Sequence, residues 1–259
     1  MIEDERDDPL MVRAVEKAFR VLTTFDAGNS RQSLTQIAER AGLDRSAAQR
    51  FTHTLSKLGY LSKDPRTKYY ELTAKTLSLA YEYTRSSPVV LRAHPYLSHI
   101  NRTTEETVSL TALEGTDIIY LSRYLSPNVL DTDVTIGSRL PAFCTSGGLA
   151  LLSAMPDAQV EDILSRSDLK AYTTKTKYQL PEIWEQINLT RSRGFATVEE
   201  QLYTGDISMG APIVTPDGQV VAAVSLSASR FRYTEASLIE NFAASVVTAA
   251  RSMSQALQL

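Results

Sequence analysis

The sequence predicts an α+β protein with two domains: a small helical one that ends in a β-hairpin, and a larger one in which helices and strands alternate. Three observations lead to this prediction. Apolar residues recur at helical spacing in the first sixty residues, and strand-like runs bounded by turn signals recur after residue 106. The chain of 259 residues is also long enough to form two separate cores.

The charges are unevenly distributed along the chain, although the net charge of the whole is only −3. Residues 9–75 contain twelve Lys or Arg and six Asp or Glu, whereas residues 76–259 contain fourteen and nineteen. An excess of basic side chains in one part of a chain is typical of a surface that meets phosphate groups. Small domains also differ this much in charge by chance, so the pattern needs support from motifs.

The composition disfavours several classes of protein. No apolar run reaches the roughly 18 residues that a membrane-spanning helix needs. The acidic start, residues 1–8, does not have the basic and then apolar pattern of a secretory signal. Cys144 is the only cysteine, which excludes an internal disulfide and a zinc site built on several thiolates. We therefore expect a cytoplasmic protein without a metal site.

Three helices are predicted in the first sixty residues. The segment 11–25 has apolar residues at helical spacing. Ser33 is placed to cap a second helix, which Gly42 ends. Asp44 is placed to cap a third helix that runs to about Leu58. Two helices joined by a short turn that contains Gly are typical of a helix-turn-helix.

The third helix has a polar face that suits the major groove of DNA. Its expected buried stripe consists of Ala47, Phe51, Leu55 and Leu58. The opposite face and its flanks carry small, amide and basic side chains, namely Arg45, Ser46, Gln49, Arg50 and His53. Gln pairs with adenine and Arg with guanine, while flanking Arg or Ser residues hold phosphates. Taken alone, the same face could be an ordinary solvated surface.

A basic hairpin is predicted directly after this helix. Short strands are expected at residues 60–63 and 68–72, separated by a turn at residues 64–67. The hairpin is tipped with Lys63, Arg66 and Lys68. A helix-turn-helix followed by a basic hairpin is a winged helix-turn-helix, so we predict a DNA-binding domain over residues 9–72.

The rest of the chain is predicted to form a linker helix and an α/β domain. The linker helix covers residues 73–87 and ends at the Ser-Ser-Pro segment that precedes the second domain. Residues 88–259 alternate between helical and strand periods, which indicates a sheet with helices packed on it. Strands are expected near residues 107–113, 118–122, 194–198, 208–214 and 220–228, and helices near 89–103, 146–154, 156–165, 180–192 and 234–257.

Two segments of this domain are candidates for binding a ligand. Thr145, Ser146 and Gly147 open a helix in a glycine-containing bend, where free amide groups and the helix dipole favour an anion such as a carboxylate. Ordinary capping of that helix by Thr145 or Ser146 would explain the same residues. The second candidate is the segment 199–209, which contains Gly205 and leads into a strand, and which could equally be a plain loop.

Motifs in both domains, in this order and spacing, resemble the IclR family of bacterial transcriptional regulators over nearly the whole chain. In the first domain they are residues 34–38, 42–46, 50, 55 and 59–61. In the second domain they are residues 137–141, 145–148, 193–195, 199–200, 205 and 210–213.

The resemblance implies a GAF-like effector-binding domain over residues 88–259, a homodimer or dimer of dimers, palindromic double-stranded operators and a small organic acid as effector. By position it implies that Ser146 and Gly147 form a backbone anion site. The residues it places along the pocket are Glu200, Ser208, Ser225 and Ser227. Family members often have Gly-Lys where this chain has Gly148-Leu149, and sometimes Cys at the place of Ser208, which leaves the exact contacts open.

The run of residues 44–50 looks like that of regulators of aromatic-acid catabolism within the family. We therefore predict a transcriptional regulator that is controlled by a small organic effector. A carboxylate is the expected class, and an aromatic acid is one option within it. A DNA-binding scaffold or regulator without a small-molecule ligand is the alternative.

An enzyme is disfavoured because the chain lacks the motifs that would carry a reaction. There is no dinucleotide-binding glycine motif, no phosphate-binding lysine loop and no nucleophile elbow. The histidines are His53, His94 and His99, and the first lies on the predicted DNA-binding face. We expect no catalytic residues and no cofactor.

Overall fold

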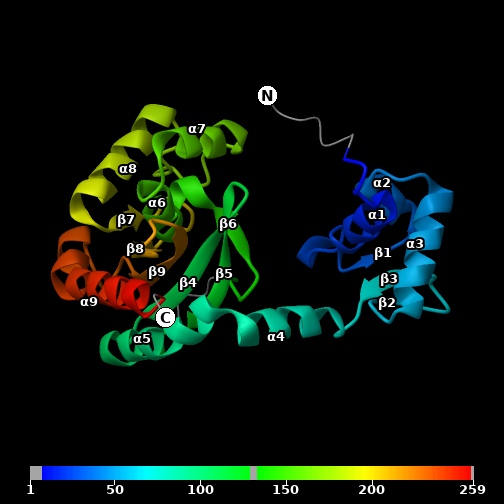
Figure 1. Ribbon diagram of the computed structural model, residues 1–259, viewed down its shortest axis with the longest axis horizontal. Helices are drawn as coiled ribbons and strands as arrows, with labels where there is room; N and C mark the ends of the chain where they lie inside the picture. The colour runs from blue at the N-terminus through cyan, green and yellow to red at the C-terminus, as the bar shows by residue number, and fades with distance from the viewer. Residues whose placement is uncertain (1–7, 129–132, 258–259) are drawn as a thin grey trace. The chain divides into compact units, whose positions relative to one another are not determined.

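The structure, a computed structural model, describes residues 8–128 and 133–257 (Figure 1). The chain divides into two compact units, one ending at Tyr83 and the other beginning at Thr84. Among the described residues, no helix is long and apolar enough to span a membrane.

The N-terminal unit combines three short helices with a small antiparallel sheet. The helices are α1 (Arg13–Leu22), α2 (Leu34–Ala41) and α3 (Arg45–Lys57), with a 3₁₀ turn at Ala27–Asn29. The strands are β1 (Arg31–Gln32), β2 (Leu61–Lys63) and β3 (Tyr70–Leu72), in the order β1-β3-β2. The predicted helix-turn-helix and hairpin are present. Strand β1 was not predicted, because two residues are too few to give a periodic pattern.

Side-chain caps fix the ends of the two helices in the helix-turn-helix. Ser33 and Gln36 form a capping box, in which the Ser33 amide donates to Gln36 Oε1 over 2.9 Å. Gly42 ends α2 with a φ of +62°, a left-handed conformation that glycine adopts without strain. Asp44 Oδ1 accepts a hydrogen bond of 2.8 Å from the amide of Ala47 at the start of α3.

The buried face of α3 is rotated relative to the predicted one. Ala48, Thr52 and Leu55 are buried, whereas Leu58 is 54% exposed, so the predicted burial of Leu58 is wrong. Thr52 lies in the core because its hydroxyl donates a 2.8 Å hydrogen bond to the carbonyl of Ala48, and an apolar pattern does not register such a residue. The rotation leaves the predicted polar face exposed, with Arg45, Ser46, Gln49, Arg50 and His53 on it.

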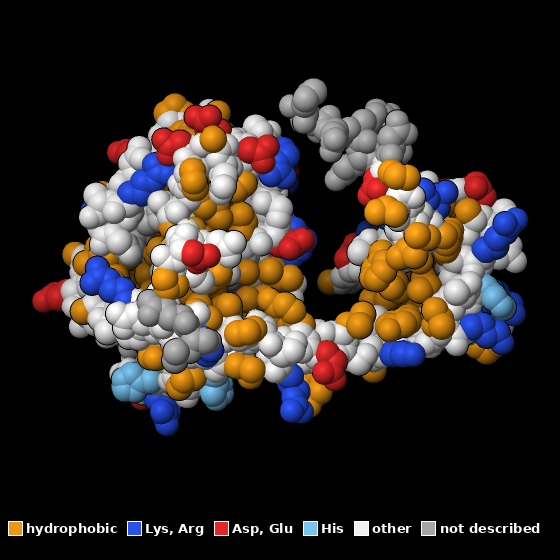
Figure 2. Space-filling model, in the orientation of Figure 1, with side chains coloured by type: hydrophobic (Ala, Val, Ile, Leu, Met, Phe, Trp, Pro, Cys, Tyr) orange, Lys and Arg blue, Asp and Glu red, His pale blue; other side chains and the backbone are white. Residues whose placement is uncertain are grey.

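An apolar face of α1 is exposed in this chain. Val12, Val15 and Phe19 are 60%, 52% and 57% exposed, respectively. Figure 2 shows hydrophobic side chains gathered on the surface of the N-terminal unit. Such a concentration of apolar surface is typical of a site that contacts another protein surface.

The C-terminal unit is built on a six-stranded antiparallel sheet, which α4 (Thr76–Ser86) joins to the N-terminal unit. The strands, in the order β6-β5-β4-β9-β8-β7, are β4 (Thr107–Glu114), β5 (Asp117–Tyr124), β6 (Arg139–Pro141), β7 (Ala196–Glu199), β8 (Asp206–Val214) and β9 (Val220–Ser229). The helices are α5 (Pro88–Thr104), α6 (Ser146–Ser153), α7 (Asp157–Arg166), α8 (Leu180–Arg193) and α9 (Glu235–Ala256). The short strand β6 was not predicted.

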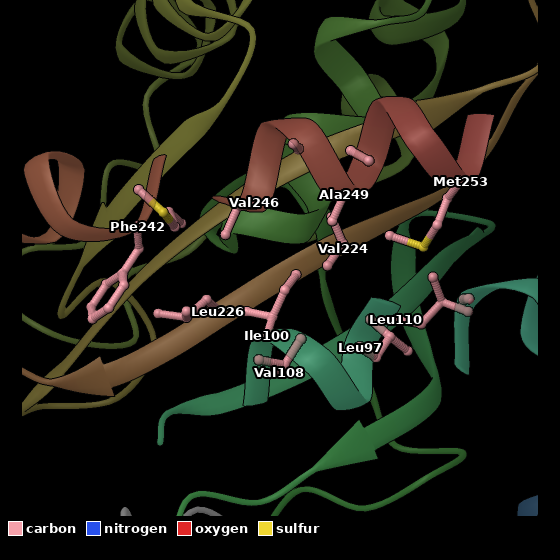
Figure 3. Packing of buried hydrophobic residues seen from close by; sticks show 14 of the residues in the cluster. Leu97, Ile100, Val108, Leu110, Val224, Leu226, Phe242, Val246, Ala249 and Met253 are labelled. Atoms are coloured by element: carbon pink, nitrogen blue, oxygen red, sulfur yellow. The ribbon is translucent and has the colours of Figure 1, made fainter. Parts of the chain in front are cut away.

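One face of the sheet packs against α5 and α9 (Figure 3). Val224 and Leu226 of β9 point into this core, to which Val246 and Met253 of α9 also belong. Successive side chains of a strand point to opposite faces, so Ser225 lies on the other side of the sheet.

The second face of the sheet packs against α6, and glycines permit the close approach. All residues of 146–152 are buried. A Cβ on Gly210 of β8 would lie 2.6 Å from the carbonyl oxygen of Ser146. A Cβ on Gly148 would lie 2.1 Å from the carbonyl oxygen of Ala142. The beginning of α6 is therefore held directly against the sheet, next to the polar side chains of β8 and β9.

Candidate functional site

A concave surface in the N-terminal unit lies between α3 and the β2–β3 hairpin. Six residues that the sequence predicts to contact DNA line it, namely Arg45, Ser46, Gln49, Arg50, His53 and Lys63. The remaining lining residues are Leu34, Thr54 and Tyr70. The fold thus brings the polar face of α3 and one basic residue of the hairpin to a single surface.

Acidic side chains of the described residues do not neutralise the cations on this surface. Among the residues that the structure describes, no carboxylate forms an ion pair with Arg45 or Arg50. The Lys63 ammonium lies 4.9 Å from the centroid of the Tyr70 ring, which holds it over the surface without cancelling its charge. Cations left without acidic partners on a concave face are suited to DNA phosphates and base edges.

Arg66 and Lys68 lie outside the concave surface, on the exposed loop of the hairpin. Asp64 Oδ1 accepts hydrogen bonds of 2.8 Å from the amide of Arg66 and 2.9 Å from that of Thr67. Lys68 adopts a φ of +65°, and its ammonium donates to the carbonyl of Pro65 over 2.6 Å. The loop is therefore internally fixed, and it presents Arg66 and Lys68 at the tip of the wing.

The C-terminal unit contains a cavity between the sheet and the beginning of α6. Six of the seven residues predicted for the effector pocket line this cavity, namely Thr145, Ser146, Gly147, Ser208, Ser225 and Ser227. Apolar side chains complete much of the wall, including Ile118, Val134, Leu140, Cys144, Val198 and Leu202. The lining of the cavity thus combines hydroxyl groups with apolar side chains.

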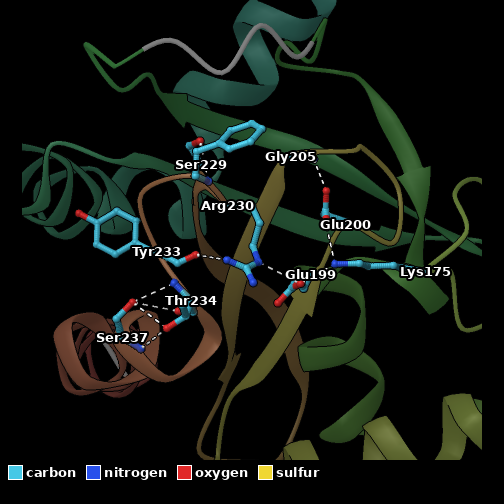
Figure 4. A network of polar contacts seen from close by, with 10 residues as sticks. Lys175, Glu199, Glu200, Gly205, Ser229, Arg230, Tyr233, Thr234 and Ser237 are labelled. Carbon is cyan, nitrogen blue, oxygen red and sulfur yellow. Dashed lines mark hydrogen bonds and ion pairs between the residues drawn. The ribbon is translucent and has the colours of Figure 1, made fainter.

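Glu200 is the exception, because it does not line the cavity. Its Oε2 lies 2.5 Å from Lys175 Nζ, and its Oε1 accepts a 2.7 Å hydrogen bond from the amide of Gly205 (Figure 4). The Lys175 ammonium holds the pKa of Glu200 below its usual range. Glu200 therefore fixes the loop that leads into β8, and the structure does not bring it to the lining that the resemblance implied.

The first turn of α6 leaves amide groups at the cavity. Thr145 caps the helix, because its Oγ1 accepts a 3.3 Å hydrogen bond from the amide of Gly148. Ser146 and Gly147 are the first two residues of the helix, so their amides have no acceptor within it. Both residues line the cavity. Capping by Thr145 and an anion-attracting helix end therefore coexist here.

Two charged residues of the lining, Arg123 and Asp206, were missed by the sequence analysis. Asp206 begins β8 two residues before Ser208, and residues two apart share a face of a strand. That spacing was a signal in the sequence that would have found it.

Arg123 reaches the cavity because of an irregularity in the sheet. In the β4–β5 pair the register shifts, so that Ser122 pairs with Leu110 but Tyr120 pairs with Thr111. This bulge places both Tyr120 and Arg123 on the cavity side, where simple alternation would put them on opposite faces. The Arg123 guanidinium donates to Ser109 Oγ over 3.3 Å and lies 5.5 Å from the Tyr120 ring centroid.

Burial controls the ionisation of the groups in the cavity. It raises the pKa of the Asp206 carboxyl from 3.8 to about 7, against the opposing effects of the Arg123 charge and a hydrogen bond with Ser208. Burial also raises the pKa of the Tyr120 hydroxyl and of the Cys144 thiol to about 12 in each case. Tyr120 and Cys144 are therefore neutral at pH 7, and Cys144 is not a reactive thiolate.

Stability is expected to depend on pH through Asp206. Because its pKa is higher in the folded protein than in the unfolded chain, the folded state binds the extra proton, and stability falls as the pH rises from about 4 to about 7. Asp206→Asn should remove this decline. The melting temperature of the variant, relative to that of the wild type, should therefore increase from pH 4 to pH 7 and stay at the higher value above pH 7. Thermal unfolding in a series of buffers measures it.

Asp217→Asn is the matched control, because Asp217 lies on the exposed turn between β8 and β9 and a hydrogen bond with Thr215 lowers its pKa. A lowered pKa contributes stability that is lost only as the pH falls below about 4, so between pH 4 and pH 7 this variant should keep a constant difference in melting temperature from the wild type. A difference between Asp206→Asn and the wild type that shrinks as the pH rises from 4 to 7 would contradict the burial of the Asp206 charge.

Metal binding has no support in the described part of the chain. There, no group of three or more His, Cys, Asp and Glu residues is arranged to hold an ion.

Comparison with known protein families decides the class of this protein. Residues 14–65 match the IclR helix-turn-helix domain, and residues 81–255 match the C-terminal domain of bacterial transcriptional regulators of the IclR type. The chain belongs to the IclR family. It is a DNA-binding transcriptional regulator, and its curated relatives are regulators and not enzymes.

Individual relatives extend over almost the whole chain. The Pca regulon regulatory protein of Pseudomonas putida is 34% identical over 247 residues, which cover 95% of this chain and 84% of that protein. The crystal structure of a protein from Rhodococcus sp. RHA1 is 32% identical, has a TM-score of 0.81, and covers 95% of this chain and 98% of its own. An IclR homologue from Microbacterium hydrocarbonoxydans, solved in complex with 4-hydroxybenzoate, has a TM-score of 0.77 at 22% identity, with 95% of this chain and 99% of that chain covered. The predicted family and fold class are thereby confirmed.

Proposed function

We propose that this IclR-family regulator binds a palindromic operator and that a small aromatic carboxylate controls this binding. Residues 9–72 bind the DNA, residues 73–87 link the two domains, and residues 88–259 bind the effector. The observation that carries the proposal is the cavity at the beginning of α6, where amides and hydroxyls meet an apolar wall.

The chemistry of the cavity supports an aromatic carboxylate. The amides of Ser146 and Gly147, at the positive end of α6, suit a carboxylate group. Apolar side chains such as Ile118, Leu140 and Val198 suit a hydrocarbon ring. A protein of the same fold has been solved with 4-hydroxybenzoate, which has both parts.

The concave surface of the N-terminal unit supports binding in the major groove. It lies between α3 and the wing, and Gln49 and Arg50 lie on the exposed face of α3. Two copies related by a two-fold axis would place two such helices in successive major grooves, and such a dimer would require a palindromic operator. The protein acts on DNA in this proposal, and we place it in the cytoplasm.

The exposed apolar face of α1 supports a dimer. A second copy of the chain would cover Val12, Val15 and Phe19, and a self-complementary contact of this kind closes into a two-fold dimer. Two dimers can associate further into a dimer of dimers.

Phe19→Glu is expected to shift the protein from dimer to monomer, because the substitution would bury a charge in the proposed contact. Sedimentation or light scattering at micromolar concentration measures the change in mass. Phe231→Glu is the matched control, since Phe231 is 94% exposed in the C-terminal unit and should leave the mass unchanged. A Phe19→Glu protein with the same mass as the wild type would rule out this face as the dimer contact.

Operator binding with and without acids tests the function as a whole. Full-length protein is mixed with the DNA that flanks its own gene at a fixed salt concentration, together with a panel of aromatic and aliphatic carboxylates. A specific complex that one aromatic acid strengthens or weakens supports the proposal, because an effector must bind the free and DNA-bound forms with different affinity. A complex that is indifferent to every acid would favour a regulator without a small-molecule ligand. The absence of any specific complex would contradict the DNA-binding assignment of α3.

The coupling between the two sites is expected to run through α4, which is the segment that joins the two units. A carboxylate held at the beginning of α6 would bias the C-terminal domain between two arrangements, and α4 would transmit the difference to the DNA-binding domains of the dimer.

A further inference from the structure

The effector cavity contains a carboxyl group that a site for an acid would not need. Asp206 and Arg123 are the charged side chains among the residues that line the cavity. A bound monocarboxylate would therefore share the cavity with a second carboxyl group and with one guanidinium. Like charges in a desolvated site repel each other strongly, so the position of Asp206 constrains which acids the cavity accepts.

Asp206 is held firmly in this position. Its amide donates to the carbonyl of Tyr203 over 3.3 Å, and its carbonyl accepts a 2.8 Å hydrogen bond from the amide of Glu200. Glu200 is itself tied to Lys175 and Gly205, as Figure 4 shows. These bonds fix the backbone of Asp206 where its side chain lines the cavity.

The surroundings of the Asp206 carboxyl leave it able to accept another hydrogen bond. Ser208, Arg123, Tyr120 and Tyr203 line the cavity together with Asp206, and the charge of Glu200 in the preceding loop also acts on it. Ser208 forms a hydrogen bond with the carboxyl, and a carboxylate has about four acceptor positions. A hydroxyl group of a ligand would satisfy a remaining one, whereas a second carboxylate would add a further negative charge.

We propose that Asp206 determines the specificity of the cavity, by accepting a hydrogen bond from a hydroxyl group of a monocarboxylate and by excluding dicarboxylates. This inference rests on the proposed function, since it assumes that the cavity is the effector site. It narrows the effector class from aromatic acids in general to hydroxylated aromatic monocarboxylates.

Three acids of similar shape test the proposal. They are 4-hydroxybenzoate, benzoate, which lacks the hydroxyl, and terephthalate, in which a second carboxylate replaces it. Their affinities for the full-length protein are measured by calorimetric titration at pH 8, where Asp206 is mostly ionised. The wild type should bind 4-hydroxybenzoate about tenfold more tightly than benzoate, and terephthalate more weakly than either.

Two substitutions separate the charge of Asp206 from its hydrogen bonding. Asp206→Asn removes the charge and keeps an acceptor, so it should improve terephthalate binding about tenfold and retain part of the preference for the hydroxyl. Asp206→Leu removes both, so it should bind 4-hydroxybenzoate and benzoate equally. Asp217→Asn, on its exposed turn, should leave all three affinities at the wild-type values.

The outcomes distinguish this inference from the proposed function. If Asp206→Asn and Asp206→Leu bind the three acids in the same ratios as the wild type, the role of Asp206 is overturned while the effector site stands. If none of the three acids binds the wild type at millimolar concentration, both the inference and the aromatic-acid proposal fail. Because the readout is a ratio between ligands, a general loss of stability in a variant does not imitate the expected result.

Discussion

Replacing Gly148 by alanine is expected to destabilise the effector-binding domain severely. The added Cβ would lie 2.1 Å from the carbonyl oxygen of Ala142 and 2.4 Å from its Cα. Both are backbone atoms, so α6 would have to move away from the segment that precedes it. Overpacking typically costs about 1–3 kcal/mol and occasionally more, and a contact with backbone belongs at or above the upper end.

Chemical denaturation of the full-length protein measures this effect. Trp184 is the only tryptophan of the chain and is partly buried in the core around α6, so its fluorescence reports on the C-terminal unit. The denaturation midpoint should fall far below that of the wild type, together with the affinity for any acid that binds the cavity.

Two further alanine variants serve as controls. Gly147→Ala would place its Cβ 2.7 Å from Thr111 Oγ1, a single side-chain atom rather than several backbone atoms, so a smaller loss is expected. Gly28→Ala, in the N-terminal unit, would meet only Asp26 Oδ1 at 3.4 Å and should leave the tryptophan transition unchanged. A Gly148→Ala protein with the wild-type midpoint would show that α6 is free to shift. The conclusion that the beginning of α6 is held directly against the sheet would then be wrong.

The N-terminal unit was largely predictable from sequence because its signals are local. Ser33, Gly42 and Asp44 mark helix ends through hydrogen bonds and backbone angles that depend on a few neighbouring residues. The prediction that Leu58 is buried was wrong because it was based on the spacing of apolar residues alone. The true buried face includes Thr52, whose hydroxyl is satisfied within the helix.

The cavity was predictable only in part, because its lining depends on long-range pairing. Ser208, Ser225 and Ser227 lie on two strands that pair directly, and the resemblance to the family already placed them in the pocket. Arg123 enters the lining through a bulge between β4 and β5, and no local pattern in the sequence marks the position of that bulge.

The position of Glu200 depends on a partner that is distant in sequence. The resemblance implied that it lines the pocket, but Lys175 lies 25 residues away and holds the carboxylate at the loop. The spacing of residues along the sequence does not predict an ion pair between residues so far apart in the chain. The same pair gives Glu200 a supporting role, since the loop that it fixes carries Tyr203 and Asp206 to the cavity.

Replacing Gln49 or Arg50 by alanine is expected to weaken operator binding by about 1–3 kcal/mol for each substitution, because each side chain is placed to contact a base edge. Both residues lie on the exposed face of α3 and line the concave surface between α3 and the wing. The loss should be much smaller on scrambled DNA, since base contacts contribute little to nonspecific binding. Fluorescence anisotropy with operator and scrambled duplexes at several salt concentrations measures both effects.

Lys63→Ala is expected to behave differently, and the contrast identifies the role of each residue. Lys63 lies on the hairpin rather than on α3, so its ammonium is expected to meet a phosphate. Its removal should weaken binding to operator and scrambled DNA alike and lower the dependence on salt by about one counterion. Arg102→Ala, an exposed substitution on α5 in the C-terminal unit, should change neither the affinity nor its dependence on salt.

Equal losses of affinity on the two duplexes for Gln49→Ala or Arg50→Ala would mean that the residue contacts phosphates. Full operator affinity in both variants would mean that another surface of the protein reads the DNA.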